Sequence, residues 1–166
     1  MIFVTVGTHE QAFNRLVQCV DELKANGVIE EEVVIQTGFS TYEPKHCTWS
    51  KLFAYDDMIK HVEEASIVIT HGGPSSFIMP LQVGKIPIVV PRKKEYDEHV
   101  HDHQEDFAKE VEARQKNIIV VEDVNKLGET LQNYEKIVQS MSNGMTSNNE
   151  NFNKEFSKIV DRLFAK

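Results

Sequence analysis

Short runs of apolar, largely β-branched residues alternate with segments of helical periodicity along most of the chain. The runs cover residues 2–6, 33–36, 66–70, 86–90 and 118–121, with a weaker candidate at 52–55. Continuous apolar runs are typical of strands buried on both faces of a parallel sheet, and the helices between such strands form right-handed crossovers. The alternation therefore predicts an α/β fold, in which a Rossmann-like parallel sheet is flanked by helices.

The helices are predicted from apolar residues spaced three or four apart and from residues that start or stop helices. The first covers 11–24 and ends before Asn26-Gly27. We expect Asp56 to cap a helix over 56–65, and Gly84 to end a helix over 75–83. The last two are expected over 97–115 and from Asp123 onward.

The 166 residues divide into a main domain and a C-terminal appendage. Residues 1–139 hold the predicted sheet and its helices. Residues 140–151 are rich in Asn, Ser and Gly, which predicts a flexible linker. Residues 152–166 carry an apolar stripe that predicts an amphipathic helix. That helix either packs on its own domain or docks on another chain.

Composition restricts the partners and the compartment. The net charge of −8 argues against a nucleic-acid partner, because duplex affinity needs a cationic surface. Cys19 and Cys47 lack metal-site spacing, so we expect free thiols in a reducing compartment. The chain begins directly with a predicted strand, and no apolar run approaches the roughly 20 residues of a membrane span. We therefore expect a cytoplasmic protein.

The segment His-Gly-Gly-Pro-Ser-Ser, 71–76, stands between a predicted strand and a predicted helix. Gly72 and Gly73 allow positive φ and a close backbone approach, and Pro74 suits the first helical position. Ser75 and Ser76 would then add hydroxyls to the free amides of a helix N-terminus, which is typical of a phosphate site. The alternative is a tight turn with an ordinary helix cap.

A similar turn follows the first predicted strand, where Gly7, Thr8 and His9 lead into a helix. Parallel strands end at one edge of a sheet, and ligands bind there near the switch in strand order. Two such turns could hold a diphosphate between them. The usual dinucleotide and P-loop motifs are absent from the sequence. The side chain of His71 is either hydrogen-bonded to backbone or turned toward the ligand.

Three histidines, His99, His101 and His103, lie two residues apart, with acidic residues among them. A metal site is one interpretation of this cluster. We favour the other, a solvated loop and helix start, and predict no metal site.

The segments ITHGGPSSFIMPLQVGKIPIVVP and DHQEDFAKEV resemble the C-terminal, nucleotide-sugar-binding half of MurG-like GT-B glycosyltransferases. From IFVTVGTHEQAFNRLV onward, residues 1–130 are similar to the single-domain catalytic subunits of two-component transferases. These act in the dolichol pathway, as the N-acetylglucosamine transferase, and in bacterial exopolysaccharide and capsule synthesis. The resemblance implies half of a GT-B fold.

The resemblance also implies roles for individual residues. The first turn and the second would hold the diphosphate, the backbone at Tyr55 would meet uracil, and Gln104 would touch the sugar. His9 becomes the candidate catalytic base, unless the partner supplies one. Where relatives carry a ribose-binding Glu, this chain has Met79, which we leave out of the site. The expected nucleotide-sugar site comprises Gly7, Thr8, Tyr55, His71, Gly72, Gly73, Ser75, Ser76, His103 and Gln104.

By this resemblance the chain transfers a hexosyl group from a UDP-sugar to a polyprenyl-diphosphate-linked saccharide, in exopolysaccharide or capsule biosynthesis. A membrane-associated, acceptor-binding subunit would recruit it to the inner face of the membrane. Helix N-termini would replace a metal, so no cofactor is expected. One alternative is a non-catalytic nucleotide-sugar-binding or regulatory subunit. Another is an unrelated α/β binding module, which predicts no affinity for UDP.

Overall fold

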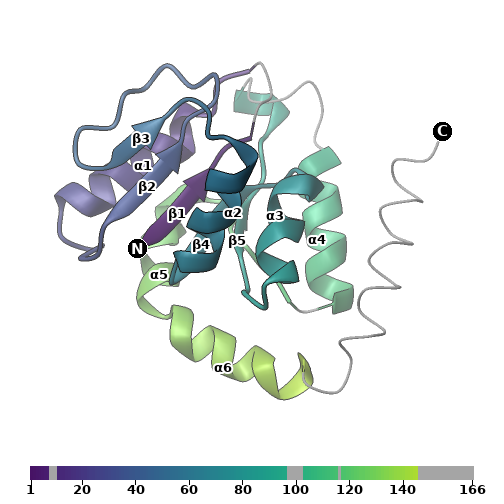
Figure 1. Cartoon of the computed structure of the whole chain (residues 1–166). Helices are drawn as coiled ribbons and strands as arrows, with labels where there is room; N and C mark the ends of the chain where they lie inside the picture. The colour runs from purple at the N-terminus through teal and green to yellow at the C-terminus, as the bar shows by residue number, and fades with distance from the viewer. Residues whose placement is uncertain (8–10, 97–102, 116, 146–166) are drawn as a thin grey trace.

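The computed structural model describes residues 1–7, 11–96, 103–115 and 117–145, which form a parallel sheet covered by helices on both faces (Figure 1). The sheet has six strands in the order β3-β2-β1-β4-β5-β6, and every neighbouring pair is parallel. The strands are β1 Ile2–Thr5, β2 Val33–Gln36, β3 Thr48–Ser50, β4 Ile67–His71, β5 Ile88–Val90 and β6 Ile119–Val120.

Alternate strand residues face two separate helical layers, as the pleat requires. On one face, Val4 and Ile69 join a core with α1 (Asn14–Ala25), α5 (Leu127–Gln132) and α6 (Tyr134–Met145). On the other face, strand residues pack against α2 (Tyr55–Glu64), α3 (Pro74–Gln82) and α4 (His103–Gln115). Figure 1 shows α2, α3 and α4 together on one side of the sheet. Short 3₁₀ turns, η1 Lys94–Tyr96 and η2 Val124–Lys126, complete the fold.

The strand order reverses at β1. Thr5 is in register with Gln36 of β2 on one side and with Thr70 of β4 on the other. The chain therefore winds outward in both directions from the β1/β4 pair, which makes the carboxyl ends of these two strands the topological switch point.

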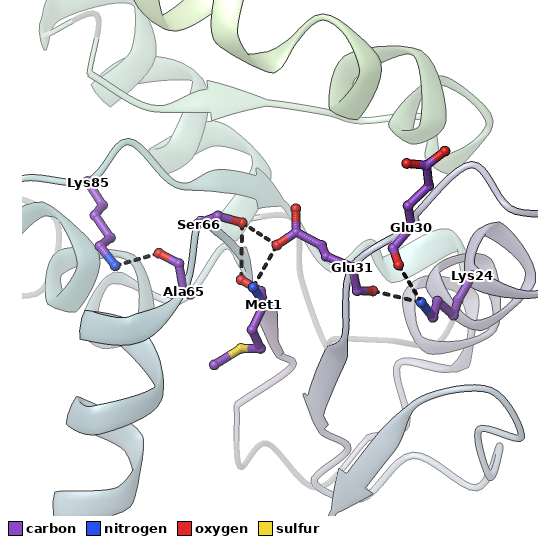
Figure 2. Close-up of polar contacts among 7 residues, drawn as sticks. All are labelled: Met1, Lys24, Glu30, Glu31, Ala65, Ser66 and Lys85. Atoms are coloured by element: carbon purple, nitrogen blue, oxygen red, sulfur yellow. Dashed lines mark hydrogen bonds and ion pairs between the residues drawn. The ribbon is translucent and has the colours of Figure 1, made fainter.

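The amino-terminal edge of the strands is closed by polar contacts (Figure 2). Lys85 donates hydrogen bonds to carbonyl oxygens at the end of α2, including that of Ala65. The amino group of Met1 lies 2.7 Å from a Glu31 carboxylate oxygen, to which Ser66 also donates. Partial burial raises the pKa of Glu31, but these two hydrogen bonds outweigh it, and the net shift is below the ordinary value. The contacts at this edge hold the fold together.

The predicted strands at the centre of the sheet are confirmed, but the strand predicted at 52–55 is wrong. The third strand is β3, which starts four residues earlier in the chain and pairs with β2. It is a half-exposed edge strand, so it lacks the apolar run that marks the central strands. The helix that follows begins at Tyr55 with Ala54 as its N-cap. Asp56 is therefore not the cap. It lies in the first turn, where its negative charge interacts favourably with the positive end of the helix dipole.

The C-terminal part differs from the prediction in extent. The single helix expected from Asp123 is divided into η2, α5 and α6. Helix α6 runs to Met145, so residues 140–145 of the predicted linker are helical. Apolar side chains of α6, among them Ile137, Val138 and Met141, pack on the core and outweigh the low helix propensity of its neighbours. The rest of the linker, the predicted helix 152–166, and residues 97–102 of the predicted helix 97–115 lie outside the described residues.

No helix in the described part of the chain combines the length and apolar character that crossing a membrane requires.

Candidate functional site

Two glycine turns meet beside the switch point. Gly7 follows β1 with a φ of +76°, and Gly38 follows β2 with a φ of +57°. A Cβ atom added to Gly38 would lie less than 3.0 Å from the carbonyl oxygen of Gly7. The two turns are thus packed backbone to backbone, in a conformation and at a separation that only glycine accommodates.

The imidazole of His71 lies between the turn after β1 and the turn after β4. His71 is the last residue of β4 and its side chain is buried. A Cβ atom on Gly7, and equally one on Gly73, would come within 3.0 Å of ring atoms of His71. The ring therefore joins the two turns that the sequence predicts at one edge of the sheet.

Two hydrogen bonds fix this ring. The amide of Gly73 donates to His71 Nδ1 at 3.1 Å, and His71 Nε2 lies 2.8 Å from the Oγ of Ser76. Because Nδ1 accepts, the neutral ring carries its proton on Nε2 and donates it to Ser76; this tautomer is assigned from the network. The hydroxyl proton of Ser76 is then left to donate to another acceptor. Of the two interpretations of His71, the structure supports the one with a bond to backbone.

Gly72 and Gly73 do not use the positive φ that glycine allows. Gly73 has a φ of −71°, and the glycines with positive φ do not include Gly72. The reason for glycine at these positions is close approach. A Cβ atom on Gly72 would lie 2.8 Å from the Cβ of Gln104, as one on Gly73 would press on His71.

Helix α3 begins at Pro74, the predicted first helical position, and its N-cap is Gly73. Gly73 has no side chain, and no side-chain hydrogen bond caps α3 in the described structure. The ordinary cap of the alternative interpretation is therefore missing from this helix. Pro74 has no N–H, and Ser76 donates its own to the carbonyl oxygen of Gly73 at 3.0 Å, so what this end of α3 offers an anion is mainly the positive end of its dipole.

Two of the amides expected to meet phosphate are engaged within the chain. Gly7 donates its N–H to Thr5 Oγ1 at 3.2 Å, and Gly73 donates its own to His71. Thr5 in turn donates to the side-chain oxygen of Gln36. A buried pair of polar side chains therefore anchors the backbone of Gly7. The Ser76 hydroxyl is one side-chain donor that the described residues present here.

Gln104 joins the same cluster from α4. Its Cβ lies against Gly72, and its Oε1 accepts a hydrogen bond from the backbone N–H of Arg92 at 3.2 Å. Among the described residues no hydrogen bond engages its side-chain NH₂, which can therefore donate to a ligand. His103 is exposed at the first position of α4.

Carboxylates next to Gln104 are paired with a lysine. Glu105 and Glu122 lie 3.1 Å and 2.7 Å from Lys109 Nζ. A hydrogen bond between the two carboxyl groups raises the pKa of Glu105 and lowers the pKa of Glu122. Lys109 thus offsets negative charge that would otherwise repel an anionic ligand.

The structure does not bring Tyr55 into this cluster. Tyr55 is the first residue of α2, and its side chain is 70% exposed. It shares the carboxyl edge of the sheet with the turns, but among the described residues no hydrogen bond or ring contact joins it to them. Its predicted role rests on its backbone and not on its side chain.

Several predicted residues cannot be placed. Thr8 and His9 lie outside the described residues, as do His99 and His101, and only the backbone of Ser75 is described. Within the described part of the chain, no group of three His, Cys, Asp or Glu side chains is arranged to hold a metal ion.

Arg92 is a residue of this edge that the sequence analysis missed. It follows β5 after Pro91, and its side chain is fully buried. Its guanidinium donates at 2.6 Å to the carbonyl oxygens of Val6 and Gln11. The available signal was an arginine next to a buried strand, at the edge where the turns lie.

Arg15 adds a second guanidinium near this edge. It donates to the carbonyl oxygens of Pro91 and Glu122, which follow β5 and β6, and it lies 4.8 Å from the ring centroid of Tyr96. The carboxyl edge therefore carries fixed positive charge although the whole chain is acidic.

Residues 1–163 match the model of the glycosyltransferase family 28 C-terminal domain. The UDP-N-acetylglucosamine transferase subunit ALG13 of Homo sapiens is 29% identical over 119 residues, and that of Mus musculus is 32% identical over 120 residues. Each alignment covers 66% of this chain and 10% of the relative, so the chain spans about a tenth of the length of these relatives.

Two solved structures share the fold. The glycosyltransferase SnogD from Streptomyces nogalater superposes with a TM-score of 0.51 at 17% identity, covering 85% of this chain and 39% of SnogD. The glycotransferase of kitacinnamycin gives a TM-score of 0.52 at 13% identity, covering 98% of this chain and 42% of that protein. The predicted fold, a Rossmann-like half of a GT-B architecture, is confirmed.

Proposed function

We propose that this chain, which belongs to the glycosyltransferase family 28 C-terminal domain family, is the donor-binding catalytic subunit of a UDP-sugar glycosyltransferase. The observation that carries the proposal is the bridge made by His71 at the switch point. It holds the turn after β1 against the turn after β4 and presents the Ser76 hydroxyl there. This is the place at which nucleotide ligands bind in open α/β sheets.

The chemistry demands that negative charge developing on the leaving UDP is stabilised. The Ser76 hydroxyl and the uncapped N-terminus of α3 would serve the diphosphate, and the nearby guanidinium of Arg92 would add a fixed positive field. These groups are held in place before the reaction, so they need little reorganisation. We propose no divalent metal for this step.

The acceptor side lies beyond this chain. The coverages show that each of the two solved structures is more than twice as long as this chain. The relatives in the other comparison are named as subunits of a transferase. We propose that a membrane-associated partner binds a polyprenyl-diphosphate-linked saccharide and brings this chain to the inner face of the membrane. The transferred group would be a hexosyl unit of an exopolysaccharide or capsule. The base that deprotonates the acceptor hydroxyl would be His9 or a group of the partner.

One observation favours a second candidate, a non-catalytic nucleotide-sugar-binding or regulatory subunit. Met79, at the position of the expected ribose-binding acid, packs in the apolar cluster around Phe3. Its side chain belongs to the core, so a contact to ribose has to come from elsewhere in the site.

The test is calorimetric titration of the purified chain with UDP, together with a transfer assay. The assay would follow a labelled UDP-sugar into the lipid fraction, with and without the co-expressed partner. Binding of UDP with partner-dependent transfer supports the catalytic proposal. Binding without transfer in the complex supports the regulatory subunit. No binding to either the chain or the complex overturns both and favours an unrelated binding module.

A further inference from the structure

The arginine that follows β5 is buried among the elements that build the candidate site. Arg92 has no exposed surface, although a buried guanidinium is costly unless its donors are satisfied. Two of its donors reach backbone carbonyl oxygens at 2.6 Å. If packing were the only role of this position, an apolar side chain would fill it without the free-energy cost of burying a charge.

The two carbonyls stand at opposite ends of the first turn. Val6 directly precedes Gly7, and Gln11 lies on the far side of the turn, just before α1. One guanidinium therefore joins the end of β1 to the residues just before α1. Its two terminal nitrogens donate one to each carbonyl in a fixed planar geometry, which the flexible ammonium of a lysine does not reproduce.

Arg92 also reaches the other parts of the site. Its backbone N–H donates to Gln104 Oε1, which ties the start of α4 to the end of β5. Its guanidinium lies 5.1 Å from the ring centroid of Phe13, the N-cap residue of α1. Phe13 in turn donates its N–H to Ser40 Oγ, beyond the turn after β2.

We propose that Arg92 is a positioning residue for the donor: it fixes the first turn and Gln104 relative to the glycine turn after β4, and its buried charge attracts the diphosphate. The proposal rests on the proposed function, because the ligand it serves is the UDP moiety. The residue acts through the backbone it holds, so no contact between Arg92 and substrate is needed.

The test compares Arg92→Met, which removes the charge and the fork, with Arg92→Lys, which keeps only the charge. The control is Asp21→Asn, which disturbs another buried polar anchor that holds the loop around residues 42–46. For each variant the melting temperature and the dissociation constant for UDP are measured, using the complex with the partner if the isolated chain does not bind. Hydrogen exchange of the peptides containing residues 6–13 is measured in parallel.

We expect Arg92→Met to raise the dissociation constant for UDP by about tenfold or more, with a smaller rise for Arg92→Lys. Exchange at residues 6–13 should be faster in Arg92→Met and unchanged in Asp21→Asn, even where both variants melt at similarly lowered temperatures. Affinity and exchange at the wild-type level in Arg92→Met, or an equal loss of affinity in Asp21→Asn, would overturn the proposal. If the wild-type chain and its complex both fail to bind UDP, the proposed function fails. The exchange data then still decide whether Arg92 holds the turn.

Discussion

Gly7 and His71 are packed so closely that the backbone of the turn after β1 contacts the imidazole of His71 at the end of β4. A single carbon added at Gly7 would come within 3.0 Å of the ring. The contact joins two residues far apart in the sequence: His71 ends β4, and Gly7 follows the neighbouring strand β1. It makes the geometry of the site depend on the absence of a side chain.

The first prediction uses this contact. Gly7→Ala should lower the free energy of unfolding by about 2–4 kcal/mol and weaken UDP binding, because strain at positive φ adds to a clash with His71. Gly27→Ala is the matched control, since Gly27 has a φ of +79° but nothing within 4 Å of the added carbon. Thermal melts and UDP titrations of both variants check this. Equal effects in the two variants would show that the contact with His71 has no energetic weight.

The second prediction concerns the hydroxyl of Ser76. Ser76→Ala should weaken UDP binding by about 1–2 kcal/mol, a factor of roughly 5 to 30, because a hydrogen bond to a charged phosphate is lost. Ser66→Ala, at the sealed amino edge, should leave the affinity unchanged. Calorimetric titration measures both. An unchanged affinity in Ser76→Ala would remove this hydroxyl from the site.

A third prediction concerns metal ions. If the N-terminus of α3 and the fixed cations neutralise the diphosphate, the dissociation constant for UDP should be the same in Mg²⁺ as in EDTA, within about twofold. Titrations in the two buffers check this directly. A strong requirement for Mg²⁺ would contradict the proposed metal-free site.

A fourth prediction concerns pH and Asp21. Burial on its own raises the pKa of Asp21, but hydrogen bonds from the Tyr42 hydroxyl and from the amides of His46 and Lys45 outweigh it and bring the pKa below its ordinary value of 3.8. The stabilisation is therefore present above pH 4 and is lost as pH falls through the lowered pKa of the folded state.

Asp21→Asn should then cost about 1–3 kcal/mol of unfolding free energy at pH 7 and less in acid. Denaturant unfolding of both proteins between pH 7 and pH 3 provides the comparison. A difference that stays constant across this range would show that the charge of Asp21 does not contribute.

The sequence predicted those parts of the fold that depend on continuous apolar runs. The strands β1, β2 and β4 are buried on both faces, so their composition alone marks them. The edge strand β3 was missed because Thr48 and its neighbours are half exposed and carry no such pattern. Helix α6 extends past its predicted end because packing on the core overrode local composition.

The positions of the two glycine turns were predicted, but the contacts that connect them were not. The two turns follow from glycines after strands, and Pro74 was correctly placed at the start of its helix. The packing of His71 against Gly7, and the hydrogen bond from Arg92 to the carbonyl oxygen of Val6, are contacts between residues far apart in the sequence. Local patterns carry no information about such partners, and the need for Gly72 became clear only from the position of Gln104.

The interlocked turns also restrict how this binding site can change during evolution. At Gly7, Gly38, Gly72 and Gly73 any side chain would meet a neighbour at less than 3.0 Å, so these positions offer no route to a new sugar preference. Tyr55 and His103 are exposed at the same edge and can be replaced without repacking. A lineage that acquires a different donor would therefore diversify at the rim of the site while its centre stays the same.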